Sequence, residues 1–363
     1  MPGVAARGAG IDRVPVRGLF QRRIAGDDAL LRLAELRFAQ AGLAAEVYAG
    51  TAAELDWILG FAPSAEHPPM VHLDRSVNIL RPADRATVAG IADRFAGRIS
   101  GLVVHDKADM VSRVDDLVGV LVELGERLGT GPGRPLLFLE YAAGLDLDWF
   151  VGVGRRLRDA EAIGLCVDIG HVGVSEARRS FRRAHPDLEL TALRAPDPRL
   201  PDLVGDVQGA VDRALPAVLE LTRALGEIGK PVHFHLHDGH PLVPGLPDHF
   251  GFLTRLPIPF DYRGYRSLGP LYGPSGLAAI VPVAIEGCGA DRVSFTLEIH
   301  QAEGRLPLGD AAGLFRHWRD LTNAERTNYW LSVLAQNAVL AHNAVRSGHQ
   351  EAVGAAGGSV ERG

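Results

Sequence analysis

Short apolar runs alternate along this chain with longer segments in which apolar residues recur every three to four positions. The short runs predict β-strands, and the longer segments predict helices between them. This alternation is typical of βα units in a parallel sheet. Strands are expected at residues 14–20, 43–48, 69–74, 100–105, 135–140, 164–169, 231–237 and 293–299, and helices at 27–41, 51–59, 82–96, 111–128, 147–162, 206–228, 275–289 and 310–348.

Eight strands with helices between them fit a closed (β/α)₈ TIM barrel over residues 11–350 better than an open doubly wound sheet. Residues 172–205 and 239–274 interrupt the alternation of strands and helices. They are expected as long loops over the barrel mouth, after the sixth and seventh strands. The final helical region could pack on the barrel wall or form a homodimer contact. Residues 1–10 and 351–363 are expected to be disordered tails.

Composition narrows the class of protein. The chain has 363 residues, 47% of them hydrophobic, and a net charge of −6. The negative charge and the presence of only two lysines, Lys107 and Lys230, argue against nucleic acid as a partner and favour a small-molecule substrate. Two cysteines provide no disulfide framework, which fits a cytoplasmic location. No apolar run reaches the ~18–20 residues of a membrane span, and the first residues lack the apolar core of a signal peptide.

Metal-ligand side chains stand at the ends of the predicted strands. Glu140 ends PLLFLE, Asp168 and His171 end GLCVDIGH, His235 lies in PVHFHLH, and Glu298 lies in RVSFTLEIH. Strand ends converge on one mouth of a barrel, so carboxylates and imidazoles there indicate a divalent-metal site. Each residue also has an ordinary structural explanation: a salt bridge to a barrel arginine for the glutamates, and a helix N-cap for Asp168.

The seventh strand is rich in histidine. Alternation places His233, His235 and His237 on one face, where His235 is the best candidate ligand. The alternative is a partly buried polar strand in which one histidine makes a structural hydrogen bond.

Two further histidines, His72 in MVHLD and His105 in VVHDK, close the third and fourth strands. Each alone is more often structural, but together they favour a second metal ion. Lys107 could neutralise an anionic intermediate or be a charge on the rim. Asp248, followed by His249, could complete a second or third metal position or form an Asx turn in the long loop.

The segments LLFLE, CVDIGH, HFHLHD and TLEIH, in this order, resemble the xylose-isomerase-like TIM-barrel superfamily over roughly residues 43–300. That superfamily includes sugar isomerases, ketose 3-epimerases and endonuclease IV repair enzymes. The resemblance to the epimerases implies that Glu140, Asp168, His235 and Glu298 bind one divalent metal. It also implies that the two glutamates are the acid/base pair and that His171 contacts substrate.

Some residues depart from that pattern. Xylose isomerase proper has a lysine two residues after its first glutamate, whereas Tyr141 and Ala142 follow Glu140 here. His72 and His105 resemble the endonuclease IV branch, which builds a multinuclear zinc site. A third branch, the multinuclear non-heme iron oxidases that modify peptides, uses a similar set of ligands.

These features predict an isomerase or epimerase that acts on a small sugar-like or hydroxy-keto substrate by metal-assisted proton transfer. One to three divalent ions per chain are expected, of Mn, Zn, Fe, Co or Mg. A multinuclear phosphoesterase, a multinuclear iron oxidase and a barrel that only binds a ligand remain alternatives. Metal count separates the first hypothesis from the next two.

Overall fold

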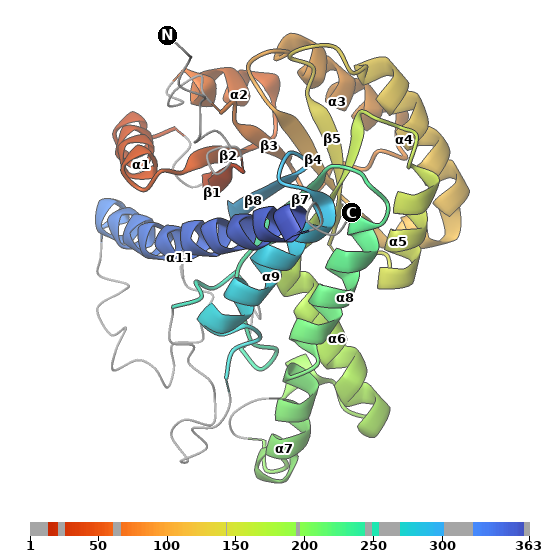
Figure 1. The fold of residues 1–363 in the computed structure, drawn as a ribbon, viewed down its shortest axis with the longest axis vertical. Helices are drawn as coiled ribbons and strands as arrows, with labels where there is room; N and C mark the ends of the chain where they lie inside the picture. Colours follow the sequence, from red (N-terminus) through yellow and green to blue (C-terminus); the bar gives the residue numbers. More distant parts are fainter. Residues whose placement is uncertain are drawn as a thin grey trace.

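The computed structural model describes residues 14–20, 26–60, 67–142, 144–193, 197–243, 249–253, 269–300 and 322–358. Eight parallel strands pair in sequence order, and β8 pairs with β1 to close a barrel. The predicted (β/α)₈ barrel is therefore confirmed (Figure 1). The strands are β1 (Val16–Phe20), β2 (Ala44–Ala49), β3 (Met70–Leu73), β4 (Gly101–His105), β5 (Leu136–Tyr141), β6 (Ile163–Asp168), β7 (Val232–Leu236) and β8 (Val293–Leu297).

Helices surround this barrel, and several begin at the polar caps that the sequence supplies. Asp27, Thr51 and Asp146 each accept a hydrogen bond from a backbone N–H of the first helical turn. The helices are α1 (Asp28–Gln40), α2 (Ala52–Leu59), α3 (Pro82–Arg94), α4 (Val114–Leu128), α5 (Leu147–Arg156), α6 (Ile169–Ala184), α7 (Leu200–Val211), α8 (Ala214–Gly226), α9 (Gly273–Cys288) and α11 (Asn323–Gly358), with 3₁₀ turns at Ala108–Arg113 and Leu190–Ala192.

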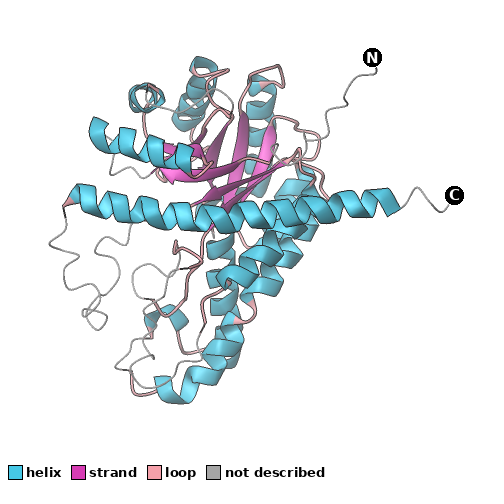
Figure 2. Ribbon diagram, turned by 60° about the vertical axis from the view of Figure 1, so that its left-hand side comes forward, coloured by secondary structure: helices cyan, strands magenta, loops and turns pink. Residues whose placement is uncertain are grey.

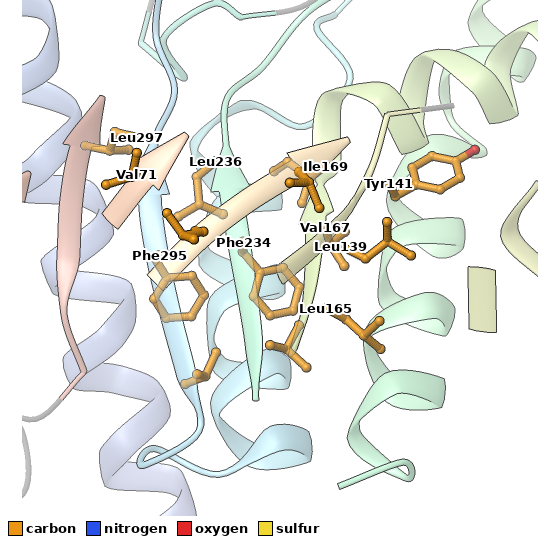
Figure 3. Packing of buried hydrophobic residues seen from close by; sticks show 14 of the residues in the cluster. Val71, Leu139, Tyr141, Leu165, Val167, Ile169, Phe234, Leu236, Phe295 and Leu297 are labelled. Atoms are coloured by element: carbon orange, nitrogen blue, oxygen red, sulfur yellow. The ribbon is translucent and has the colours of Figure 1, made fainter. Parts of the chain in front are cut away.

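The two faces of each strand have different roles. Figure 3 shows Phe234 and Leu236 of β7 packed beside Phe295 and Leu297 of β8 in the apolar layer that joins strands to helices. Successive side chains of a strand point to opposite faces. The intervening residues of β7, among them His235, therefore point into the barrel interior. The part of the interior nearest the mouth carries polar groups.

The segment after β6 corrects one prediction. Residues 172–205 were expected as a long loop, but α6 begins directly after β6 and α7 follows at Leu200. Both helices have an apolar face, and Phe181 of α6 packs with Leu203 and Val207 of α7 in a small second core. Among the described residues of this segment, the arginines of α6 are exposed, Pro186 and Pro198 lie between the helices, and Pro201 lies in the first turn of α7. This helical pair projects beyond the barrel (Figures 1 and 2).

Other boundaries also differ from expectation. The predicted helix 206–228 is two helices, α7 and α8, and the chain 351–358, predicted as a disordered tail, continues α11 to Gly358. After β7, the described parts of 239–274 contain no helix before α9, as expected. Residues 1–10 and 310–321 lie outside the described part of the chain.

Helix α11 lies across α9 and α1 on the outside of the barrel (Figure 2). Its Trp330 is buried, and the indole Nε1–H donates to the carbonyl oxygen of Ile299 at 2.6 Å. The apolar face of this helix therefore packs on the barrel wall, while the homodimer contact stays a prediction. Within the described residues, no helix combines the length and apolar character needed to cross a membrane.

Candidate metal centre

Histidines and carboxylates meet at the C-terminal mouth of the barrel in two adjacent groups. Within each group, the potential ligand atoms all lie within 4.8 Å of one another. Glu298, one residue beyond β8, belongs to both. We call them the first cluster (His72, Glu140, His235 and Glu298) and the second cluster (Asp168, His237, His249 and Glu298).

The first cluster is built around His235. Its Nδ1 lies 3.2 Å from Oε1 of Glu140 and 2.9 Å from Oε2 of Glu298. The other oxygen of Glu140 lies 3.2 Å from Nε2 of His72 and 3.5 Å from Nε2 of His105. All five side chains are buried. His105, on β4, lies beside the first cluster through its approach to Glu140.

Hydrogen bonds to other groups show which nitrogen of two of these histidines faces the carboxylates. Nδ1 of His72 lies 3.2 Å from the carbonyl oxygen of Leu73, so this nitrogen carries a proton and Nε2 faces Glu140. Nε2 of His235 lies 3.0 Å from Glu46, so Nδ1 faces the two carboxylates. The nitrogen that faces the carboxylates carries a proton when the ring is positively charged, and it offers a lone pair to a metal ion once that proton is lost.

In the second cluster, Asp168 is held by two donors on the same oxygen. Its Oδ1 accepts the backbone N–H of His171 at 2.8 Å and Nε2–H of His237 at 2.7 Å. Asp168 is thus the N-cap of α6 as well as a candidate ligand. Its Oδ2 lies 3.3 Å from Nε2 of His171 and 3.9 Å from Nε2 of His249.

Glu298 connects the second cluster to the first. Its Oε1 lies 3.4 Å from Nε2 of His249 and 3.4 Å from Nε2 of His300. The rings of His237, His249 and His300 form a stack, with centroids 4.3 and 4.2 Å apart. His249 has a φ of 70°, which is uncommon for a residue other than glycine and is found at functional sites.

Several buried polar atoms in this region make no well-aligned hydrogen bond within the described residues and have only the nitrogen–oxygen contacts given above, although such atoms usually find a partner. Leaving a buried polar atom unpaired costs about 1–3 kcal/mol, and divalent cations between these atoms would satisfy them. Imidazole and carboxylate donors of this kind suit zinc, iron, cobalt or manganese. The residues present therefore fit a metal centre. The unpartnered atoms are Nε2 of His72, Nδ1 of His105, Oε2 of Glu140, Oδ2 of Asp168, Oε2 of Glu298 and Nε2 of His300.

The carboxylates of the centre are ionised at neutral pH. Burial alone would raise the pKa of Glu298, but His235 and His249 hold that pKa well below its usual value. The same balance, with His105, His235 and His72 as neighbours, keeps the pKa of Glu140 well below its usual value. Both glutamates therefore offer negatively charged oxygens to a metal ion without first losing a proton.

Two residues of β2 were not predicted as part of the site. The hydroxyl of Tyr48 donates to Oε1 of Glu298 at 3.1 Å, and its ring lies over that of His72, with centroids 4.4 Å apart. Glu46 lies beneath His235, fully buried. A charged residue inside the apolar run of β2, two positions before the tyrosine, was the available sequence signal, because alternation places both on one face. His300, two positions after Glu298, was missed in the same way.

Two other predicted site residues are not placed in the clusters. Lys107 donates from Nζ to the carbonyl oxygen of Arg75, on the rim. Burial, together with the charges of Arg75 and Arg81, lowers the pKa of Lys107, and this position agrees with a rim charge. Asp248 lies outside the described residues.

Comparison with known proteins adds a likeness of fold only. No protein-family model and no curated protein sequence matches the chain. The carboxyl transferase domain of Rhizobium etli pyruvate carboxylase with pyruvate is similar to it with a TM-score of 0.39 and 14% identity, over 93% of this chain and 47% of that one. The same domain with 3-bromopyruvate has a TM-score of 0.36 and 16% identity, over 90% and 49%. This chain spans about half the length of those structures.

The chain is a closed TIM barrel with buried histidine, glutamate and aspartate clusters at its mouth that could hold metal ions. The fold alone does not define the reaction, because this barrel hosts many chemistries.

Proposed function

We propose that this protein is a binuclear metal-dependent hydrolase that acts on a small phosphoester. The observation that carries the proposal is the position of Glu298, whose two oxygens face two different clusters. A carboxylate shared in this way is suited to hold two metal ions side by side. Two divalent ions held by these residues would supply an activated water and stabilise the charge on the oxygens of a phosphoester as it is hydrolysed.

The arrangement supports two metal ions better than one. The mononuclear epimerase pattern needs Glu140, Asp168, His235 and Glu298 around a single ion, but Asp168 lies in the second cluster while Glu140 and His235 lie in the first. Both glutamates also approach the same nitrogen of His235. An epimerase needs its two carboxylates on opposite faces of the reacting carbon. The isomerase stays a prediction that a single bound metal would favour.

Charge favours an anionic substrate. Glu140, Asp168 and Glu298 bring three negative charges into a buried site. One divalent ion leaves that site negative, whereas two make it positive and attract a phosphate group. This argument does not require a basic chain, and the net charge here is −6.

The side chains that reach solvent mark the side from which substrate enters. His171 and His300 are 21% and 23% exposed, whereas His72 and His235 are fully buried. Nε2 of His171 lies 3.3 Å from Oδ2 of Asp168, at the start of α6. From this position beside the entrance, His171 can contact a substrate that reaches the centre.

The test is metal content and hydrolysis in the same preparation. Protein purified without chelator, and protein reloaded with zinc, manganese or iron, is analysed for metal per chain and assayed with p-nitrophenyl phosphate and bis(p-nitrophenyl) phosphate. About two equivalents and metal-dependent release of p-nitrophenol are expected. Glu298→Gln should lose both, and the matched change Glu189→Gln, between the projecting helices, should lose neither.

Other outcomes overturn the proposal and identify an alternative. One equivalent together with isomerisation of a ketose would return the protein to the epimerase class. Bound iron with oxygen consumption and no hydrolysis would identify an oxidase. Failure to bind metal after reloading would exclude each of these metal-dependent reactions.

A further inference from the structure

The barrel interior beneath the metal centre contains a connected set of polar side chains. TIM-barrel interiors are usually filled by layers of branched apolar residues. Here β1, β2, β7 and β8 instead contribute buried polar side chains below the mouth. They are Arg17, Glu46, His233 and Thr296, and each is at most 4% exposed.

Glu46 is the junction of this set. Its Oε1 accepts a hydrogen bond from Nε2 of His235 at 3.0 Å. Its Oε2 lies 2.9 Å from Nε2 of His233 and accepts the hydroxyl of Thr296 at 2.6 Å. Because His235 faces Glu140 and Glu298 with its other nitrogen, one imidazole ring separates Glu46 from the first cluster.

We propose that Glu46 is a positioning residue that fixes His235 with Nδ1 toward the first metal position and strengthens that nitrogen as a donor. This inference rests on the proposed metal function. A carboxylate that accepts the distal N–H of a ligating histidine fixes both the tautomer and the orientation of the ring, and it increases the basicity of the ligating nitrogen. The contacts to His233 and Thr296 fix the second oxygen of Glu46, so the carboxylate cannot rotate away.

Arg17 places a buried positive charge in the same part of the barrel as this carboxylate. The guanidinium is buried, and its Nη2 donates to Oγ of Ser100 at 3.3 Å. Burial lowers the pKa of Arg17 to about 10, and Glu46 opposes that shift. Removal of Glu46 alone would leave a buried cation without a compensating charge. A test therefore needs the double variant Arg17→Met/Glu46→Gln beside the single one.

The position of Glu46 predicts an asymmetric effect. His235 belongs to the first cluster and not to the second. Glu46→Gln should therefore weaken one of two metal equivalents by about 10–100-fold and leave the other unchanged. The matched control is Ser294→Ala, which removes the 2.7 Å contact to Nδ1 of His233, one step farther from the metal. This control should keep both affinities.

The measurement is competition of the metal-free protein with a chromophoric chelator for Zn²⁺, together with the visible spectrum after loading with Co²⁺. The visible absorption bands of the Co²⁺ ion bound at the weakened position should change in Glu46→Gln and in the double variant. Wild-type protein that binds no metal would contradict the proposed function itself. Two results would overturn only the role of Glu46 and leave the proposed function standing. In the first, the wild type binds two ions and both folded variants keep the wild-type affinities. In the second, the variants bind both equivalents equally more weakly.

A measurement on the wild type avoids variants that do not fold. In ¹⁵N-labelled, zinc-loaded protein, the imidazole nitrogen shifts of His235 should show a proton on Nε2 and metal on Nδ1. Metal on Nε2 would overturn the inference, because that nitrogen would then not donate to Glu46.

Discussion

His237 donates its Nε2 proton to Oδ1 of Asp168 across 2.7 Å, because its Nδ1 accepts the backbone N–H of His249 at 2.8 Å. A neutral imidazole carries one proton, so neither nitrogen of His237 is left for a metal ion. His237 therefore orients Asp168, although its ring lies among the candidate ligands. The second metal position then depends on Asp168, His249 and Glu298.

This assignment predicts different results for two neighbouring histidines. His237→Gln should still bind two metal ions and should weaken the second equivalent by about 10–100-fold, as the loss of a residue that orients a ligand does. His249→Ala should lose the second equivalent, because it removes a ligand. Metal content and zinc competition measure both. If His237→Gln lost the equivalent as completely as His249→Ala, His237 would be a ligand.

Gly170 in the first turn of α6 provides a steric test of the same contact. A Cβ at this position would lie 1.9 Å from Cε1 of His237, so Gly170→Ala must displace the imidazole. We expect a loss of about 1–3 kcal/mol in the free energy of unfolding, as in other overpacked sites, and a weaker second metal equivalent. Urea unfolding and zinc competition measure the two effects.

Gly152 of α5 is the matched control for this change, because a Cβ there would meet nothing within 4 Å. Gly152→Ala should keep both metal equivalents and stabilise the fold by about 0.5–1 kcal/mol. Equal metal binding in the two alanine variants would show that the ring of His237 does not need its observed place.

The contact between Tyr48 and Glu298 predicts that a change at Tyr48 lowers activity without unfolding the protein. Tyr48→Phe removes the donor to Oε1 of Glu298 and keeps the ring over His72. Metal-dependent turnover should fall by about tenfold, because the shared carboxylate loses a group that orients it. The control is Tyr141→Phe, whose hydroxyl instead contacts Ser175 at 3.5 Å. Turnover per bound metal decides the result, and equal values in the two variants would exclude a role for Tyr48.

The sequence predicted the main ligands because of where strands end. Glu140, Asp168, His235 and Glu298 follow apolar runs, and the closure of a parallel barrel necessarily brings such ends to one mouth. The division of these residues between two clusters was not predictable, because it depends on side-chain direction and on the register between strands. In that register Glu140 faces His105 on β4, while Asp168 faces His235 on β7.

The supporting residues were harder to find. Glu46 and Tyr48 lie in a run that reads as an ordinary strand, and their role depends on β2 and β7 facing each other across the barrel. Only the closed fold brings residues so distant in sequence together. Helix α6 was missed for a local reason. Its apolar face packs on α7, but the arginines on its exposed face made the segment look like a polar loop and concealed the helical period.

Glu189, beside the projecting helices, gives a prediction about pH. Hydrogen bonds from Arg178, and also from Arg182, lower the pKa of Glu189 to about 2 from its usual 4.5, against the effect of burial. A pKa that is lower in the folded state means that the unfolded chain binds the proton more strongly. The stabilisation is therefore complete above pH 4.5 and disappears as the pH falls toward 2.

Glu189→Gln should lower the free energy of unfolding by about 1 kcal/mol at pH 7, a small value because the pair is partly exposed to solvent. The difference from wild type should shrink between pH 4.5 and pH 3, since the Glu189 carboxylate of the unfolded chain then takes up a proton while that of the folded protein stays ionised. Urea midpoints at pH 7, 5, 4 and 3 measure this, with exposed Asp187→Asn as the control from the same segment. A difference that stayed constant down to pH 3 would mean that the arginine contacts do not depend on the charge of Glu189.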